Sequence, residues 1–273
     1  GILRSPRSYR SLQQAESYSE SCAYGGSIEI SVSEDTNFEL VVQFNKCRMT
    51  DPANELNGVL RLFGTESNFT ATIGSEAEPF TSRWEEDGGY FEYALKFEYS
   101  NFFVKENGFE TEVTIGGYLF VDYGDHGNLK VTYKDFVEHL NVDTRTSTIA
   151  AKQNGRIFEE GNLVNSGMGN VVVEATLTDF NITIAESDQN VIVYVDGTAD
   201  VTFQPSNTCA GGFYTYRTER PLKYSKALDR VIDGLFYVNE ARVEFNSDGS
   251  ITVKASGYEH RYRGTDISGV CYF

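Results

Sequence analysis

The sequence predicts an all-β protein made of extended antiparallel sheet, arranged as a β-sandwich or as a curved half-barrel. Tyr and Phe, with 17 and 19 copies among 273 residues, dominate the aromatic content, and such side chains favour a pleated surface. From Ser27 onward apolar and polar residues alternate, so that Ile28, Ile30 and Val32 share one face, as in a strand. Short turns without helical crossovers indicate antiparallel pairing.

The expected strands follow one another along most of the chain. Their ranges are 27–32, 38–44, 58–64, 69–74, 90–99, 109–115, 117–123, 128–133, 170–177, 180–185, 191–197, 199–203, 212–218, 235–245, 250–256 and 259–264. Turn dipeptides are expected at 107–108, 116–117, 196–197 and 248–249, with a Gly-rich turn at 87–89. Residues 221–233 fit either a helix with Pro221 in its first turn or an extended segment.

Three regions follow from changes in this pattern. Residues 1–21 lack sustained alternation and are expected to form a flexible or partner-bound arm. The residues through which this arm would contact a neighbouring copy are Arg4, Arg7, Tyr9 and Arg10. A polar stretch near 143–160 separates two β modules, 22–145 and 146–273, with one cysteine pair each, which suggests an internal duplication. The alternative is one continuous β domain over 22–273.

The four cysteines fall into two pairs by position, Cys22 with Cys47 and Cys209 with Cys271. No CxxC spacing occurs and the three His residues are scattered, so zinc or haem ligation is not indicated. Two disulfides fit an oxidising compartment, and four buried free thiols are the alternative.

The formal net charge of −17 excludes some partners. Nucleic-acid binding depends on basic residues that neutralise phosphates, so a chain this acidic is a poor candidate for it. No apolar run approaches the roughly 20 residues of a membrane-spanning helix. Asp122 and Asp125 crowd one Gly-containing turn and are weak candidates for a calcium site.

A short motif recurs at 97–104, 131–138 and 175–182, each time with Asn or Asp followed by Phe. At each copy the apolar positions shift by one residue, which would turn every later side chain to the other face of a regular strand. An extra residue in a β-bulge restores the face, and Asn and Asp tolerate the backbone angles this requires. We therefore expect bulges at Asn101, Asp135 and Asp179. The alternative is a shared site of these three side chains.

No signature of catalysis is present. The chain lacks GxSxG, and none of its His residues stands in a recognisable nucleophile–base pattern. The acidic run that follows Trp84 fits an exposed turn, with a sugar-binding loop as the alternative. Two sequons, at Asn68 and Asn181, mark sites that carry glycans only in a glycosylating source.

Several segments together carry a family resemblance. They are 42-VQFNKC-47, 57-NGVLRLFG-64, 100-SNFFV-104, 208-TCAGGFYTYRTERPLKYS-225 and 243-VEFNSDGSITV-253. They resemble repetitive all-β bacterial secreted or surface lipoproteins, which are mostly of unassigned function. The resemblance implies an envelope or extracellular location and assigns no catalytic residue.

Taken together, these patterns predict a non-enzymatic protein of the extracellular space, cell surface or periplasm, without a cofactor. We expect a structural subunit that self-assembles into a fibre or matrix through its N-terminal arm. One alternative is an envelope module that holds a lipid or another apolar ligand on a concave sheet. Another is a polysaccharide-acting enzyme, which would need two converging carboxylates.

Overall fold

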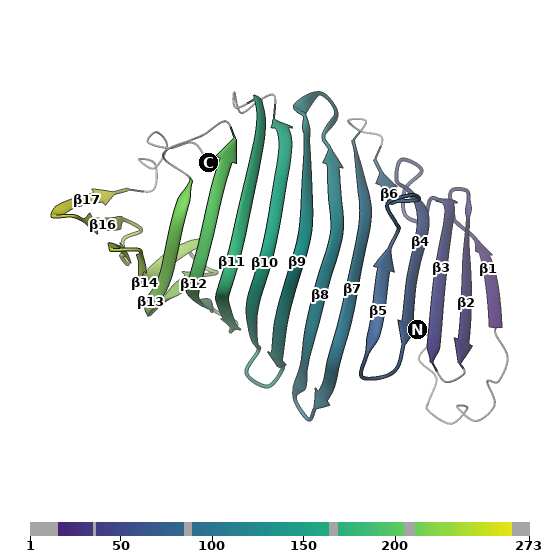
Figure 1. The fold of residues 1–273 in the computed structure, drawn as a ribbon, viewed down its shortest axis with the longest axis horizontal. Coiled ribbons are helices and arrows are strands. Elements are labelled where there is room, and N and C mark those ends of the chain that lie inside the picture. The colour runs from purple at the N-terminus through teal and green to yellow at the C-terminus, as the bar shows by residue number, and fades with distance from the viewer. Residues whose placement is uncertain (1–15, 35–36, 85–88, 164–168, 205–210, 264–273) are drawn as a thin grey trace. The chain divides into compact units, whose positions relative to one another are not determined.

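The computed structural model of the protein describes residues 16–34, 37–84, 89–163, 169–204 and 211–263. These residues form 17 β-strands in one antiparallel sheet and a single 3₁₀ turn, so the all-β prediction is confirmed (Figure 1). The strands are β1 (Glu16–Ser21), β2 (Ser27–Glu34), β3 (Phe38–Cys47), β4 (Glu55–Gly64), β5 (Phe69–Ile73), β6 (Phe80–Arg83), β7 (Tyr90–Lys105), β8 (Gly108–Asp122), β9 (Asn128–Asp143), β10 (Thr148–Leu163), β11 (Gly169–Glu186), β12 (Asn190–Gln204), β13 (Gly212–Ser225), β14 (Arg230–Val238), β15 (Ala241–Phe245), β16 (Ile251–Ala255) and β17 (Tyr258–Tyr262). The 3₁₀ turn, η1, spans Gly124–His126.

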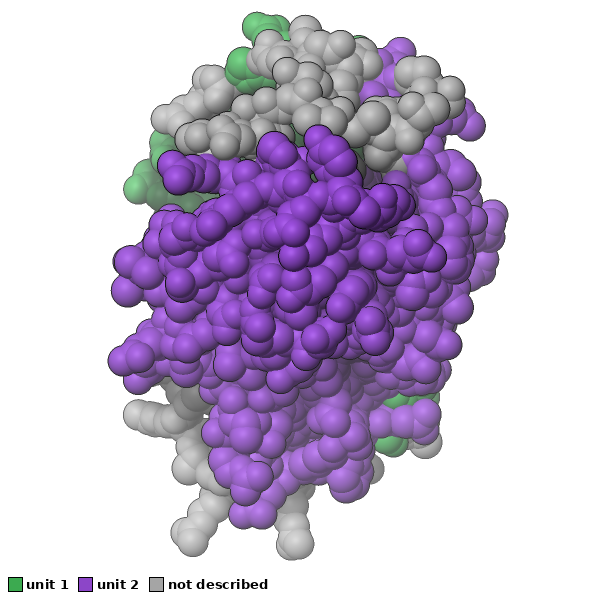
Figure 2. All heavy atoms as spheres, turned by 90° about the vertical axis from the view of Figure 1, so that its left-hand side faces the viewer, with its two compact units in different colours: residues 1–100, 116–131, 162–169 green, residues 101–115, 132–161, 170–273 purple. Residues whose placement is uncertain are grey.

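The chain divides into two compact units, coloured separately in Figure 2. Unit 1 comprises residues 1–100, 116–131 and 162–169, and unit 2 comprises 101–115, 132–161 and 170–273. The units are interleaved along the sequence, because strands β7, β8 and β9 each contribute residues to both.

Part of the predicted N-terminal arm, residues 1–21, is a strand of the sheet. Residues 16–21 form β1, which pairs with β2 along its whole length and places Tyr18 opposite Ile30. All six residues of β1 are exposed, which explains why no hydrophobic alternation marked this segment as a strand. Four residues of the predicted arm contact lie outside the described part of the chain: Arg4, Arg7, Tyr9 and Arg10.

In unit 1 the strand register separates apolar from polar side chains. One row of directly opposed residues crosses five strands as Ile30, Val42, Leu60, Ile73 and Leu95. The adjacent row on the other face of the same strands reads Ser31, Val41, Arg61, Thr72 and Lys96. Period-two alternation therefore gives this part of the sheet one apolar face and one polar face.

The core of unit 1 gathers at one end of its apolar face. Cys22 and Cys47 form a disulfide across 25 residues, and Cys47 is fully buried at 0% exposure. The rings of Phe44 and Phe80 meet edge-to-face with centroids 5.6 Å apart beside this bridge. The predicted pairing of Cys22 with Cys47 is confirmed. Cys209 and Cys271 lie outside the described residues.

Unit 2 repeats this separation of faces. Leu177 of β11 stands opposite Ala199 of β12, which in turn stands opposite Tyr214 of β13. The adjacent positions on the same strands carry Thr178, Thr198 and other polar residues. In each unit the sheet thus has one apolar face, formed from the same alternation of residue types.

The Gly-Gly dipeptide at 116–117 and the Asp-Gly dipeptide at 196–197, both predicted as turns, lie inside the long strands β8 and β12. These two predictions are therefore wrong. Gly197 has φ +127°, and a Cβ added to it would lie 2.4 Å from the carbonyl oxygen of Asp179. The neighbouring backbone therefore comes too close for any side chain. The turns at 107–108 and 248–249 are present.

Residues 221–233 contain no helix: residues 221–225 end strand β13, residues 226–229 form a turn, and residues 230–233 begin strand β14. Leu222 stands opposite Val193 of β12, and Tyr224 stands opposite Val191. Pro221 falls where the register between β13 and β14 shifts, so its missing N–H breaks no regular ladder. Pairing with β12 on the apolar face decides the conformation of a segment whose sequence fits both.

We predict that Gly197→Ala lowers the free energy of unfolding by about 1–3 kcal/mol, because alanine is strained at positive φ and meets the Asp179 carbonyl. The matched control is Gly116→Ala, where nothing lies within 4 Å of the added Cβ, and it should leave stability nearly unchanged. Urea denaturation measures both, and equal effects of the two substitutions would contradict the close approach at Gly197.

Removing the unit 1 disulfide with Cys22→Ala/Cys47→Ala should cost about 3 kcal/mol, because the bridge restricts a 25-residue segment of the unfolded chain. The midpoint of thermal unfolding measures the loss. A variant as stable as the parent would show that the Phe44 and Phe80 contacts alone hold this end of unit 1.

Candidate binding face

The apolar face of unit 1 extends beyond the disulfide core. A second row of opposed residues reads Val32, Leu40, Leu62, Ala71 and Phe97. None of these five belongs to the core cluster around Cys47; Val32 is 37% exposed and the other four are half-buried. Every strand described in unit 1 belongs to the same sheet, so no second sheet of described residues packs on this row.

Aromatic rings continue the unit 1 face past this row. Phe69 stacks on Tyr99 with ring centroids 4.4 Å apart, and Phe38 lies 6.4 Å from Phe69. Phe38 and Phe69 each stand opposite Gly64 on the intervening strand β4. Because Gly64 has no side chain, the two rings on either side of it form the surface here. This end of the face is therefore aromatic.

In unit 2 the apolar face is maintained across a bulge in β11. Thr178 pairs with Thr198 and Asn181 pairs with Asp196, so β11 has one extra residue opposite Gly197. Phe180, on the far side of the bulge, packs edge-to-face on Tyr216 with centroids 5.5 Å apart. Tyr216 stands opposite Gly197, so Phe180 stays on the apolar face although its parity differs from that of Leu177.

The three residues at which the sequence predicts bulges all have a left-handed backbone, with φ of +55° at Asn101, +51° at Asp135 and +47° at Asp179. The backbone at Asp135 faces Gly155 in the same manner as Asp179 faces Gly197. A Cβ added to Gly155 would lie 2.4 Å from the carbonyl oxygen of Asp135. Left-handed Asp and a facing Gly thus occur twice in unit 2.

The two aspartates form separate ion pairs on β10. Asp135 pairs with Arg156 at 3.0 Å, and Asp179 pairs with Lys152 at 2.7 Å. The backbone N–H of Asp179 also donates to Asn154 Oδ1 at 2.8 Å. These contacts hold each bulge to its neighbouring strand, and each carboxylate has its own cation. The geometry suits a role in register, and no contact shared by the two carboxylates supports a common site.

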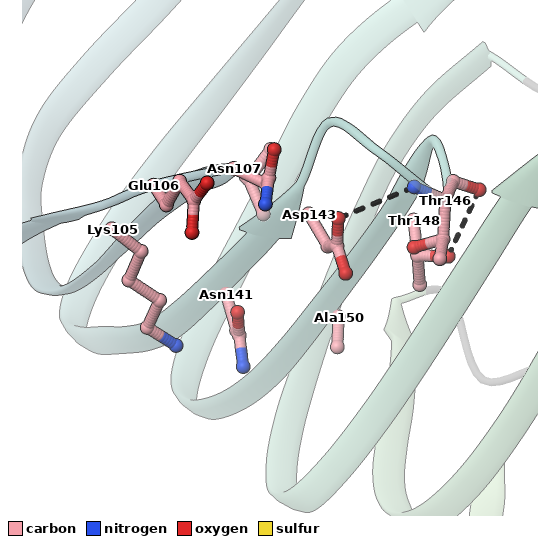
Figure 3. Close-up of a pocket in the computed structure, with 9 residues that line it drawn as sticks. Lys105, Glu106, Asn107, Asn141, Asp143, Thr146, Thr148 and Ala150 are labelled. Carbon is pink, nitrogen blue, oxygen red and sulfur yellow. Dashed lines mark hydrogen bonds between the residues drawn. The ribbon is translucent and has the colours of Figure 1, made fainter.

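A polar pocket of about 390 Å³ lies in unit 2 where the β7–β8 and β9–β10 turns meet (Figure 3). Asp143 accepts hydrogen bonds from the backbone N–H groups of Thr146, at 3.2 Å, and Arg145, at 2.8 Å. These bonds, that of Thr146 first, hold the pKa of Asp143 below its usual range. The carboxylate is occupied in fixing the turn, which makes this pocket a structural feature.

A second lowered carboxyl pKa belongs to Asp248 in the β15–β16 turn. The hydroxyl of Ser250 donates to it at 2.7 Å and the Ser250 backbone N–H at 3.0 Å, and Arg261 of β17 contributes an ion pair at 2.6 Å. Together they hold the pKa of Asp248 below its ordinary value. Arg261 thereby ties β17 to the turn.

The structure gives the predicted calcium candidates different surroundings. Asp122 Oδ1 accepts a hydrogen bond from the Gly124 N–H at 2.8 Å, and Asp125 lies on η1. Within the described ranges, no group of three or more His, Cys, Asp or Glu side chains is placed to hold a metal ion. The same part of the chain contains no helix long and apolar enough to cross a membrane.

Comparison with family models, with curated proteins and with solved structures found no match for this chain.

Sequence reasoning finds the bulged residues and misses their partners. The parity shift identifies Asp135 and Asp179 because it is visible within one strand. Gly155 and Gly197 sit on the neighbouring strands, and the Asn-Gly and Asp-Gly dipeptides that contain them are typical of turns. Lys46 was also missed, although it has φ +49° at a register shift between β3 and β4. Its motif lacks the Asn or Asp that marks the other bulges.

The pH dependence of stability should reflect Asp248. Its pKa is lowered on folding, so its contribution is present above the unfolded value of 3.8 and is lost as the pH falls through the folded value. We predict that Asp248→Asn destabilises the protein at neutral pH and that this deficit shrinks as the pH falls below about 4. Urea denaturation at a series of pH values tests this, and a deficit that is constant with pH would contradict it.

Proposed function

We propose that this protein binds an uncharged, extended apolar ligand, such as a lipid chain, on the apolar face of its sheet. The observation that carries the proposal is the row Val32, Leu40, Leu62, Ala71 and Phe97 in unit 1, which is apolar across five strands and has no described layer over it. Val32 is exposed and the other four residues are half-buried, and contiguous apolar surface that its own protein does not fully bury marks a ligand or partner site.

The chemistry of the face favours an apolar chain lying across the strands. Aliphatic residues form the row beside the core, and the rings of Phe69 and Tyr99 extend it. No charged side chain occurs in this row or in the parallel row Ile30, Val42, Leu60, Ile73 and Leu95. The net charge of −17 opposes an anionic headgroup, so the ligand is neutral or zwitterionic. The Cys22–Cys47 disulfide is compatible with a secreted or periplasmic carrier.

The other occupant to consider is a second copy of the chain, as in a self-assembling fibre or matrix subunit. The unpaired apolar face favours this candidate as well, because face-to-face packing of two sheets would bury it. The same net charge weighs against it, since two copies would repel each other. The predicted arm residues that would support assembly lie outside the described part of the chain.

Leu62→Gln should weaken binding of N-phenyl-1-naphthylamine, an uncharged apolar probe, by about tenfold or more, because it places an amide in the middle of the apolar row. The matched control is Phe63→Gln, which removes a larger apolar side chain from the opposite face, where Phe63 stands between Glu39 and Thr70. Fluorescence titration measures the affinity of both variants.

Native mass spectrometry of the freshly purified protein should show a co-purified neutral lipid that Leu62→Gln loses and Phe63→Gln retains. Equal loss of binding in the two variants would overturn the assignment of the face. Alternatively, the protein could form a dimer or polymer at high concentration, carry no bound lipid, and become monomeric in the Leu62→Gln variant. That result would overturn the lipid proposal and show that a second copy of the chain covers the face.

A further inference from the structure

A pocket of about 430 Å³ lies in unit 1 around the only tryptophan of the chain. Its walls come from the segment after β3, the start of β4, the end of β6 and the start of β7. The lining residues used below are Arg48, Glu55, Arg83, Trp84 and Tyr90. The volume lies within the usual range for small-molecule pockets.

The aromatic part of the pocket is held in place by packing. The Trp84 ring lies against Phe91, with centroids 4.9 Å apart, and against Gly89, where an added Cβ would come within 2.4 Å of the ring. The Trp84 backbone N–H donates to the Gly89 carbonyl at 3.2 Å. A preorganised ring of this kind offers a flat surface at little entropic cost.

The polar part combines donors with an acceptor. The Arg83 guanidinium lies 5.7 Å from the Tyr90 ring centroid, and no carboxylate of the described residues lies within ion-pair distance of it. Glu55 receives a hydrogen bond from Arg48 at 3.0 Å through one carboxylate oxygen, Oε2. The pocket therefore presents the N–H groups of Arg83 and the second oxygen of Glu55 to a ligand.

This combination discriminates between ligand classes. A carboxylate, sulfate or phosphate group only accepts hydrogen bonds, so it could bond to Arg83 but would leave the second oxygen of Glu55 without a donor. A sugar hydroxyl donates and accepts, so neighbouring hydroxyls can bond to Glu55 and Arg83 together. The apolar face of a sugar ring suits Trp84 or Tyr90.

We propose that this pocket binds an uncharged saccharide unit, with Trp84 as the stacking surface and Arg83 and Glu55 as hydrogen-bonding partners. All of these residues belong to unit 1, and none lies in the rows proposed to bind the apolar ligand. The saccharide site is therefore independent of the proposed function.

Trp84 reports directly on the site because it is the only tryptophan. Titration of the full chain with cellohexaose, xylohexaose and mannohexaose should change the tryptophan emission saturably for at least one of them, with calorimetry as a second measure. Hexagalacturonate serves as the acidic comparison and should bind more weakly. Arg83→Ala should raise the dissociation constant by about tenfold, the effect of losing hydrogen bonds to a charged group.

Arg61→Ala is the matched control, since Arg61 is an exposed arginine of unit 1 that pairs with Glu39 at 3.6 Å, away from the pocket. It should bind the saccharide like the parent, and circular dichroism should show both variants folded. Absence of binding by all three uncharged oligosaccharides would overturn the proposal. So would tighter binding of hexagalacturonate, or an unchanged dissociation constant in a folded Arg83→Ala variant.

Discussion

The one-residue bulge is the constraint on which the apolar face of unit 2 depends. A strand as long as β11, with 18 residues, reverses its faces if its hydrophobic pattern shifts by a single position. Asp179 absorbs that shift in a left-handed conformation, and Gly197 on β12 accepts the close approach of its carbonyl. Without the extra residue in β11, Ile182 and Ile184 would turn to the polar face.

This constraint explains several features that otherwise look unrelated. Glycines appear inside long strands because a facing bulge leaves no room for a side chain. Aspartates at exposed positions pair with Lys152 and Arg156 of β10, where they fix the bulge to the adjacent strand. A bulge also bends its strand and increases local twist, so repeated bulges set the local curvature of the sheet.

The consequence for function is a sheet whose apolar face is only partly occupied by its own core. The disulfide and the Phe44–Phe80 contact cover one end of this face in unit 1. Beyond them, alternation continues to place aliphatic and aromatic side chains on the same face. This part of the face is where we propose that the apolar ligand binds. The Trp84 pocket, which combines donors with an acceptor, is the separate site proposed for a saccharide.

By itself the sequence determined the all-β class, most strand positions, the Cys22–Cys47 pairing and the bulge at Asp179, because alternation and its interruptions are local properties of the chain. It did not determine that 16–21 pair as a strand, since every side chain there is exposed. Nor did it place the dipeptide at 196–197 inside a strand or decide the conformation of 221–233. Those outcomes depend on which backbone lies alongside, and only the tertiary structure brings Gly197 against Asp179 and Leu222 against Val193.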